Sequence, residues 1–262
     1  MADKNKIAAI IPAAGLGRRF VAGENKPLYE LLGKPLVVWA LQAVQAVVEI
    51  SEIVLVVKED DLKVAADLVE RYSITKTRRI VPGGAERQDS VYKGLGTLDK
   101  DTSIVVIHDG ARPLVDSLLI KKSIMALEGV DGVVAAVPVK DTIKEVKGKG
   151  PASSGAKGPS NSGREDGLIV QSTLNRNVLW AIQTPQTFHY AKIMEAHRKA
   201  HKEGFYATDD AALVERYGGI VGIVQGSYMN LKITTLEDIN IAETLYLKIN
   251  RDTSCLKVKG GT

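Results

Sequence analysis

Short Val- and Ile-rich runs alternate with longer helical segments along this 262-residue chain, and this alternation constrains its fold more than any other feature. The runs predict strands over Ile7–Ile11, Ile53–Val57, Arg79–Val81, Ile104–His108, Val133–Val137, Ile220–Val224 and Leu231–Thr234. Apolar positions at helical spacing predict helices over Pro35–Val48, Asp60–Tyr72, Arg87–Leu98, Ser117–Leu127, Ala191–Lys202 and Leu236–Ile249. Because alternating strands and helices form βαβ units, we expect an α/β fold with a mostly parallel central sheet covered on both faces.

The composition is that of an ordinary globular protein, with 45% hydrophobic and 25% charged residues. A net charge of only +4, with no basic run interleaved with aromatics, argues against nucleic acid as a partner. Cys255 is the only cysteine, which excludes an intramolecular disulfide. No apolar stretch approaches the roughly 18 residues of a membrane helix, and the N-terminal run is too short for a signal peptide. We therefore expect a cytoplasmic protein with no membrane partner.

The first predicted strand ends in a glycine turn with the sequence PAAGLGRRF, residues 12–20. Bare backbone N–H groups in such a turn suit phosphate oxygens, and Arg18, Arg19 and Lys26 add matching charge. The dinucleotide fingerprint requires glycine at the position of Phe20, and the Gly-Lys-Ser/Thr of a Walker A loop is missing from this region of the sequence. The turn predicts a polyphosphate-binding loop; the alternative is a strand-to-helix turn with solvated arginines.

Two more loops follow predicted strands, on the side where open α/β sheets bind ligands. The sequence PGGAERQDS (82–90) permits close backbone approach and offers the Ser90 hydroxyl, although an ordinary turn before a helix explains it as well. The sequence HDGARP (108–113) places Asp109 at a strand tip. Asp109 can hold Mg²⁺ and Arg112 can grip a phosphate, or the two can form a structural ion pair.

A Gly-, Ser- and Pro-rich segment, residues 147–164, interrupts the βα pattern and has no apolar periodicity. Such a composition buries too little surface to offset its chain entropy. The flanking runs, Thr142–Val146 and Leu168–Val170, are typical of strands. We predict a projecting β-hairpin arm with a loose tip.

Seven motifs in order resemble one family: PAAGLGRRF…NK, GGAERQDSV, HDGARPLV, PVKDTIKEV, NRNVLWAIQTPQTF, ATDDAALVE and NLKIT. They are similar to the 2-C-methyl-D-erythritol 4-phosphate cytidylyltransferases over about residues 7–246. The resemblance implies a glycosyltransferase-A-like nucleotidyltransferase domain over residues 1–249, with 141–176 as a dimerisation arm and 147–164 as its flexible tip. It also implies CTP as co-substrate, Mg²⁺ as cofactor and a homodimer joined through the arm. We expect residues 250–262 to form a frayed tail.

The resemblance also implies the roles of individual residues. Arg19 and Lys26 match the pair that stabilises the pentavalent transition state, and Arg176, from the partner's arm, and Lys232 complete the catalytic set. The matches to CTP-binding residues are Ala13, Ala14, Gly15, Gly17, Arg18, Gly84, Ala85, Ser90 and Asp109, of which Asp109 also lies near the metal. The matches to the methylerythritol phosphate site are Arg112, Thr142, Thr184 and Thr208, together with Arg176 and Lys232.

Three other functions fit part of these data. A ribitol 5-phosphate cytidylyltransferase would share the glycine loop and the fold, and is the nearest alternative. A nucleotide-binding module without catalysis could dispense with Arg176 and Lys232. A nucleotide-sugar transferase would carry an Asp-x-Asp metal motif after a strand, and the sequence has none in the expected region. In-line displacement at the α-phosphorus of CTP needs no covalent nucleophile, so cations that position and stabilise account best for these residues.

Overall fold

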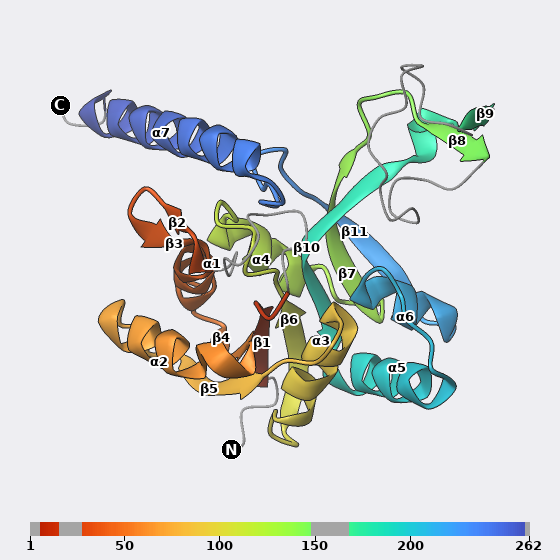
Figure 1. Ribbon diagram of the computed structural model, residues 1–262, viewed down its shortest axis with the longest axis horizontal. Helices are drawn as coiled ribbons and strands as arrows, with labels where there is room; N and C mark the ends of the chain where they lie inside the picture. The colour runs from red at the N-terminus through yellow and green to blue at the C-terminus, as the bar shows by residue number, and fades with distance from the viewer. Residues whose placement is uncertain (1–5, 16–27, 148–167, 260–262) are drawn as a thin grey trace. The chain divides into compact units, whose positions relative to one another are not determined.

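The computed structural model describes residues 6–15, 28–147 and 168–259, with side chains through residue 248. It divides into two compact units: residues 1–136 together with 182–262, and residues 137–181. Figure 1 shows the elements of each unit. The predicted site residues Gly17, Arg18, Arg19 and Lys26 and the predicted arm tip from residue 148 lie outside the described residues.

The larger unit is built on a seven-stranded sheet in the order β11-β7-β10-β6-β1-β4-β5. Strands β6, β1, β4 and β5 pair in parallel, as do β11 and β7, whereas β10 runs antiparallel to β6. The predicted α/β class with a mostly parallel sheet is therefore confirmed. The strands are β1 Lys6–Pro12, β4 Ile50–Val57, β5 Thr77–Pro82, β6 Thr102–Ile107, β7 Gly132–Pro138, β10 Trp180–His189 and β11 Val221–Gln225, with a small ladder of β2 Glu30–Leu31 and β3 Lys34–Pro35.

Helices cover both faces of the sheet, as the continuous Val/Ile strands predict. Ala9 and Ile11 of β1 point into one core with α1, α2 and α4, whereas Ala8 and Ile10 point into another with α3, α5 and α6. Figure 1 shows α1 and α2 on one side of β1 and α3 and α5 on the other. The helices are α1 Leu36–Gln45, α2 Leu62–Arg71, α3 Arg87–Gly96, α4 Ser117–Met125, α5 Tyr190–Glu203, α6 Asp210–Arg216 and α7 Leu236–Lys259, and Glu59–Asp61 forms a 3₁₀ turn, η2.

The structure differs from the sequence prediction at several elements. Strand β10 and helix α6 were not predicted, and the strand predicted over Leu231–Thr234 is wrong. In that segment the N–H of Ile233 donates to the carbonyl of Ala111 at 2.9 Å, and the N–H of Thr234 donates to Asp238 in the first turn of α7, so these bonds take the place of a strand ladder. Helix α7 continues past its predicted end at residue 249 to Lys259, so the predicted tail is helical over 250–259.

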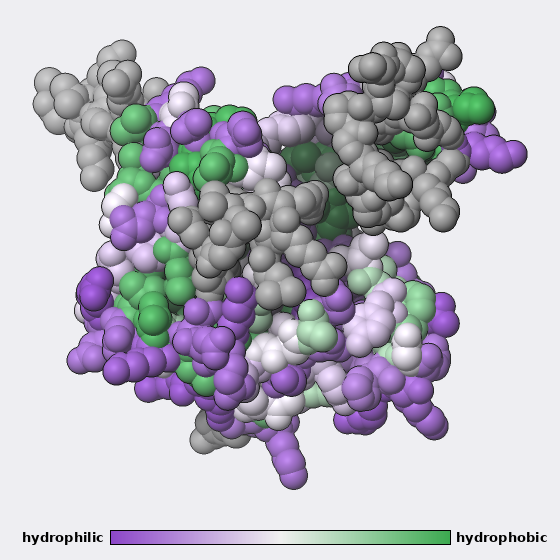
Figure 2. All heavy atoms as spheres, viewed as in Figure 1, coloured by the Kyte–Doolittle hydropathy of each residue, from purple (hydrophilic) through white to green (hydrophobic). Residues whose placement is uncertain are grey.

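The smaller unit contains the predicted hairpin. Strands β8 (Lys144–Lys147) and β9 (Ile169–Thr173) pair antiparallel, and a 3₁₀ turn, η3 (Arg176–Val178), follows. Apolar side chains of this hairpin face outward: Ile169 is 69% and Val170 is 57% exposed. Hydrophobic residues accordingly reach the surface of this unit in Figure 2.

The surface of the larger unit is different. On the face seen in Figure 2, hydrophilic residues cover most of it and hydrophobic residues form separate small patches. Within the described part of the chain, no helix combines the length and the apolar character that crossing a membrane requires.

Candidate functional site

The loop at the carboxyl end of β1 packs against the loops that follow β5 and β6. A Cβ atom placed on Gly83 would lie 2.4 Å from the Cβ of Ala14, and one on Gly110 would lie 3.2 Å from the Cβ of Ala13. The close contact at Gly83 excludes any side chain there. The structure thus brings the described start of the glycine turn, with Ala13 and Ala14 buried and Gly15 exposed, beside the two loops that the sequence singled out.

The loop after β5 is shaped by its own polar groups. The N–H of Gly84 donates to the Ser90 hydroxyl at 3.1 Å, and that hydroxyl donates to the carbonyl of Glu86 at 3.1 Å. Ser90 is buried, while Ala85 at the loop tip is exposed. The hydroxyl of Ser90 therefore fixes the loop, and the backbone around Gly84 and Ala85 remains open to a ligand.

Asp109, at the tip of β6, is the centre of the site. Its two oxygens accept from Nε of Arg87 at 2.9 Å and from Nζ of Lys232 at 2.7 Å, and Nε of Arg112 lies 4.0 Å away. Burial opposes ionisation of this carboxyl, but Arg87, Lys232 and Arg112 outweigh it and hold the pKa of Asp109 well below its ordinary value. A second carboxylate, Asp210, accepts from Arg87 at 2.7 Å. Three cations against two carboxylates give this cluster a net positive charge, which suits a phosphate.

A neutral hydrogen-bonded chain holds the Asp109 backbone. The N–H of Asp109 donates to the hydroxyl of Thr184 at 3.1 Å, and this hydroxyl donates to Nδ1 of His108 at 3.0 Å. Because the carbonyl of Arg112 can only accept, Nε2 of His108 carries the ring proton and donates to it at 3.2 Å, so Nδ1 of the neutral ring is the acceptor for Thr184. Burial lowers the pKa of His108 to about 4, so its ring is neutral near pH 7. Thr184 is one of the residues predicted to contact methylerythritol phosphate, and its hydroxyl is thus already hydrogen-bonded within the protein.

Asn230 ties the loop that carries Lys232 to the rest of the site. Its carbonyl accepts from Nη1 of Arg112 at 2.7 Å, and its Nδ2 donates to the carbonyl of Thr184 at 2.8 Å and to Gln183 at 3.2 Å. Asn230 is 1% exposed. These bonds hold Asn230, two residues before Lys232, against Arg112 and β10.

The predicted site residues fall into three groups. Ion pairs and a hydrogen bond join Asp109, Arg112, Thr184 and Lys232 in one cluster beside the glycine turn. Thr208 is exposed and precedes Asp209, which caps α6. Thr142 and Arg176 belong to the smaller unit, where Arg176 donates to the carbonyl of Lys140 at 2.6 Å.

Sequence reasoning missed Arg87, His108, Asp210 and Asn230. A signal existed for Arg87, because it is the first residue of α3 and a cation there opposes the helix dipole unless carboxylates compensate it. Asp210 gave no such signal, since an acidic residue in the first turn of a helix is common. His108 and Asn230 act through backbone partners that a sequence does not reveal.

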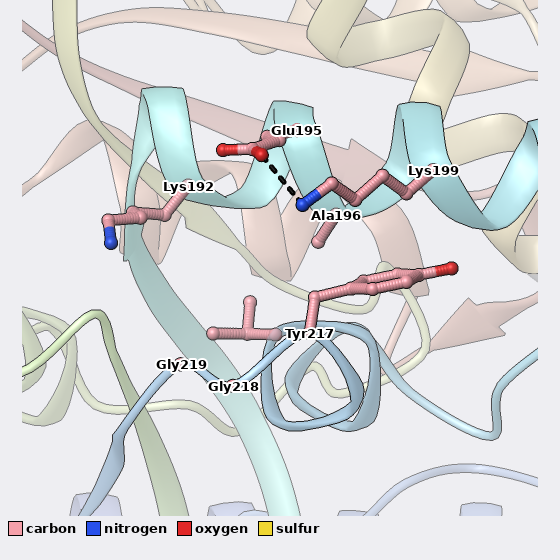
Figure 3. Close-up of a pocket in the computed structure, with 8 residues that line it drawn as sticks. Lys192, Glu195, Ala196, Lys199, Tyr217, Gly218 and Gly219 are labelled. Atoms are coloured by element: carbon pink, nitrogen blue, oxygen red, sulfur yellow. Dashed lines mark ion pairs between the residues drawn. The ribbon is translucent and has the colours of Figure 1, made fainter.

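A separate small cavity lies between α5 and the turn after α6 (Figure 3). Its charged groups are already paired: Lys199 with Glu195 at 2.8 Å, and Lys192 with Asp131 at 3.0 Å. The Tyr217 hydroxyl donates to Glu203 at 2.9 Å. The charges at this cavity are thus balanced in pairs, whereas the cluster around Asp109 has three cations against two carboxylates.

A mostly parallel sheet with a cationic cluster at its carboxyl edge defines an α/β protein whose candidate site suits a phosphorylated ligand. A sequence profile of the 2-C-methyl-D-erythritol 4-phosphate cytidylyltransferases matches residues 7–158 and 160–248. The chain belongs to the 2-C-methyl-D-erythritol 4-phosphate cytidylyltransferase family, which confirms the predicted resemblance.

Individual relatives agree with this assignment. The 2-C-methyl-D-erythritol 4-phosphate cytidylyltransferase of Pelotomaculum thermopropionicum is 44% identical over 242 residues, covering 92% of this chain and 94% of that protein. The enzyme of Halalkalibacterium halodurans is 41% identical over 244 residues, covering 93% and 98%. The crystal structure of 4-diphosphocytidyl-2C-methyl-D-erythritol synthase from Anaerococcus prevotii superposes with a TM-score of 0.77 at 34% identity, covering 94% and 97%.

Proposed function

We propose that this protein transfers the cytidylyl group of CTP to 2-C-methyl-D-erythritol 4-phosphate, forming 4-diphosphocytidyl-2-C-methyl-D-erythritol and pyrophosphate. The observation that carries the proposal is family membership over nearly the whole chain, combined with the cationic cluster around Asp109. A phosphate oxygen of the acceptor attacks the α-phosphorus, the bond to the β-phosphate bridging oxygen breaks, and pyrophosphate leaves. The acceptor phosphate is largely ionised near pH 7, so no strong general base is needed.

The site residues divide this work by position. Arg19 and Lys26 stabilise the charge that develops on the transferred phosphorus, and Arg18 with the backbone of residues 13–17 holds the triphosphate. The backbone at Gly84 and Ala85 contacts the cytidine, while Ser90 fixes that loop. Arg112, Lys232 and Thr208 bind the acceptor. Thr184 orients the backbone of Asp109, because its hydroxyl is hydrogen-bonded to the Asp109 N–H and to His108.

Asp109 is the proposed Mg²⁺ ligand. Among the described residues, no three His, Cys, Asp or Glu side chains converge on one point, so the ion would be held by one carboxylate and by phosphate oxygens, as Mg²⁺ prefers. Each Asp109 oxygen accepts one cationic hydrogen bond and keeps a lone pair for an ion. Bound Mg²⁺ would bridge and neutralise the phosphates of CTP.

The smaller unit is the proposed dimer contact. A two-stranded hairpin cannot bury its own apolar face, and Ile169, Val170 and Val178 are more than half exposed. In a two-fold dimer these side chains would be covered, and Arg176 would contact the acceptor phosphate in the partner's site. Residues 141–176 with their tip at 147–164 would form this arm, and the protein would work in the cytoplasm.

The test is incubation of the purified chain with CTP, Mg²⁺ and 2-C-methyl-D-erythritol 4-phosphate, followed by detection of pyrophosphate and of the cytidylyl product by mass spectrometry. A parallel reaction contains ribitol 5-phosphate. We expect turnover with methylerythritol phosphate to exceed that with ribitol 5-phosphate by at least about 100-fold, since polar contacts to substrate hydroxyls discriminate strongly. The reverse preference would assign the chain to the ribitol phosphate reaction.

A further inference from the structure

A row of hydrogen-bonded side chains with alternating charge, Asp109, Arg87 and Asp210, extends from the site into the core of the larger unit. Nε of Arg87 donates to Asp109 at 2.9 Å, and its Nη1 donates to Asp210 at 2.7 Å. The other oxygen of Asp210 accepts from Nε2 of His197 at 3.1 Å, and the His197 ring stacks on Tyr92. Asp210 and His197 are each 1% exposed. The line therefore begins at the site and ends among buried side chains of α3, α5 and α6.

The inner end of this line is fixed to the sheet. Asp210 is the first residue of α6, and Asp209 before it caps that helix. Nε2 of Gln186 in β10 donates to Asp209 at 2.8 Å, and the N–H of Ala211 donates back to Gln186 at 3.2 Å. Gln186 is itself 1% exposed. The carboxylate of Asp210 thus has a defined position before any ligand binds.

Arg87 links the fixed carboxylate of Asp210 to the carboxylate of Asp109. A guanidinium is a planar fork, so one that bonds two carboxylates fixes the direction of each relative to the other. Lys232 bonds the remaining oxygen of Asp109 at 2.7 Å, from the loop after β11. Two cations on different elements therefore fix the plane of the Asp109 carboxylate. Arg87 also opposes the dipole of α3, so its placement is explained by the carboxylates and not by helix stability.

We propose that Arg87 is a positioning residue that sets the orientation of the Asp109 carboxylate for nucleotidyl transfer, with Asp210 as its anchor. The inference rests on the proposed function, in which Asp109 faces the triphosphate. Arg87 acts through Asp109, so its removal lowers kcat by about 10–100-fold, the usual cost of losing a group that orients a metal or phosphate ligand. The KM for CTP changes much less, because the phosphate-binding loop is retained.

The chain offers a matched control at the opposite end of the sheet. Arg79 is also a half-buried arginine that bridges two carboxylates, Glu52 and Asp99. Its side chain is 32% exposed, against 28% for Arg87. Replacing Arg79 removes a comparable ion-pair bridge without touching the carboxyl edge of the sheet. A purely structural role for Arg87 would make the two replacements equivalent.

The experiment compares Arg87→Met, Arg87→Lys, Asp210→Asn and Arg79→Met in the assay with CTP, Mg²⁺ and methylerythritol phosphate, alongside thermal melting. We expect kcat to fall about 10–100-fold in Arg87→Met and less in Arg87→Lys, which keeps the charge but bonds one carboxylate only. Arg79→Met should keep kcat within about twofold while lowering the melting temperature. If Arg87→Met does not melt cooperatively, Arg87→Lys and Asp210→Asn decide the question. We expect the kcat of each to be lower than that of Arg79→Met.

A double-mutant cycle distinguishes action through Asp109 from independent action. If Arg87 works through Asp109, the Arg87→Met/Asp109→Asn protein is no slower than Asp109→Asn alone. Losses that multiply in the double variant would overturn the inference, as would an Arg87→Met kcat equal to that of Arg79→Met. Failure of the proposed function is separate, because the unsubstituted chain would then release no pyrophosphate.

Discussion

Two clusters of charged side chains lie at opposite ends of the same parallel strands. At the carboxyl end, Asp109 and Asp210 are buried and outnumbered by cations. At the amino end, Lys6 pairs with Glu52, Asp99 and Asp101, and Asp99 and Asp101 are 47% and 70% exposed. Charges that water surrounds are screened and contribute little, whereas buried charges keep their field. The comparison indicates that the carboxyl-end cluster keeps a field that can act on a ligand, whereas water screens most of the amino-end cluster.

The largest expected effect concerns the cations that follow β1. Lys26→Ala and Arg19→Ala should each lower kcat by about 10²–10³-fold and change the KM for CTP far less, because their charge acts where negative charge develops. Lys6→Ala, at the amino end, is the control for loss of one cation and should leave kcat unchanged. Near-normal turnover of Lys26→Ala would remove Lys26 from the catalytic set.

The next largest effect is expected if Arg176 of a second chain adds a further cation to the carboxyl-end cluster. Arg176→Ala and Lys26→Ala homodimers should both be nearly inactive, but mixing the two chains should restore activity. Each heterodimer then contains one site with both residues intact and one with neither. The measurement is activity after subunit exchange, with heterodimers verified by native mass spectrometry. Heterodimers that form without recovering activity would show that Arg176 acts within its own chain.

Asp109→Asn should raise the Mg²⁺ concentration for half-maximal activity by about 10-fold or more, because an amide is a weaker Mg²⁺ ligand than a carboxylate. Asp99→Asn, at the amino end, is the matched control and should leave the titration unchanged. An unaltered Mg²⁺ titration in Asp109→Asn would return Asp109 to a structural partnership with Arg87 and Arg112.

A smaller effect concerns pH and the stability of the free protein. The folded-state pKa of His108 is about 4, below its unfolded value, so its contribution is fully present above about pH 6.5 and is lost as the pH falls toward 4. Between pH 7 and pH 5 this amounts to about 2 kcal/mol of unfolding free energy. The pKa of Asp99 is lowered by its bond to Lys6, so the amino-end cluster responds only at lower pH.

Urea unfolding at both pH values measures this contribution. His108→Gln should lose less stability than the unsubstituted chain between pH 7 and pH 5, because it has no ring to protonate. An identical pH dependence in the two proteins would assign the effect to other groups.

The smallest effect is at the amino end. Lys6→Ala should lower the melting temperature by no more than about 2–4 °C, since Asp99 and Asp101 are exposed and screened, and Arg79 still pairs with the buried Glu52. Added salt should reduce that difference further. A large loss of stability would contradict the view that this cluster contributes little.

The Val/Ile strands and amphipathic helices were predictable because their periodicity follows from burial on the two faces of the sheet. Strand β10 was not, because its buried stretch includes Gln183, Thr184 and Gln186, whose polar groups are satisfied by distant loops. Conversely, Leu231–Thr234 has the apolar pattern of a strand, yet its N–H groups bond to Ala111 in the loop after β6 and to Asp238 in the first turn of α7.

The candidate site was predictable where residues lie in a motif, as for Asp109, Arg112 and Lys232. Arg87 and Asp210 lie in motifs that the sequence also singled out, but their meaning depends on helices α3 and α6 meeting behind the strand tip. A contact between residues 123 positions apart leaves no periodic trace in a sequence.

The enclosed imidazole of His108 has a further consequence. Its ring proton is bonded to a carbonyl and the side chain is wholly buried, so this proton exchanges with water only when the tip of β6 opens. The exchange rate of this proton therefore measures how often the structure around the tip of β6 opens in the free protein. A ligand that ties the three loops together stabilises the closed form and slows that exchange, so one ring proton reports occupancy of the site without any turnover.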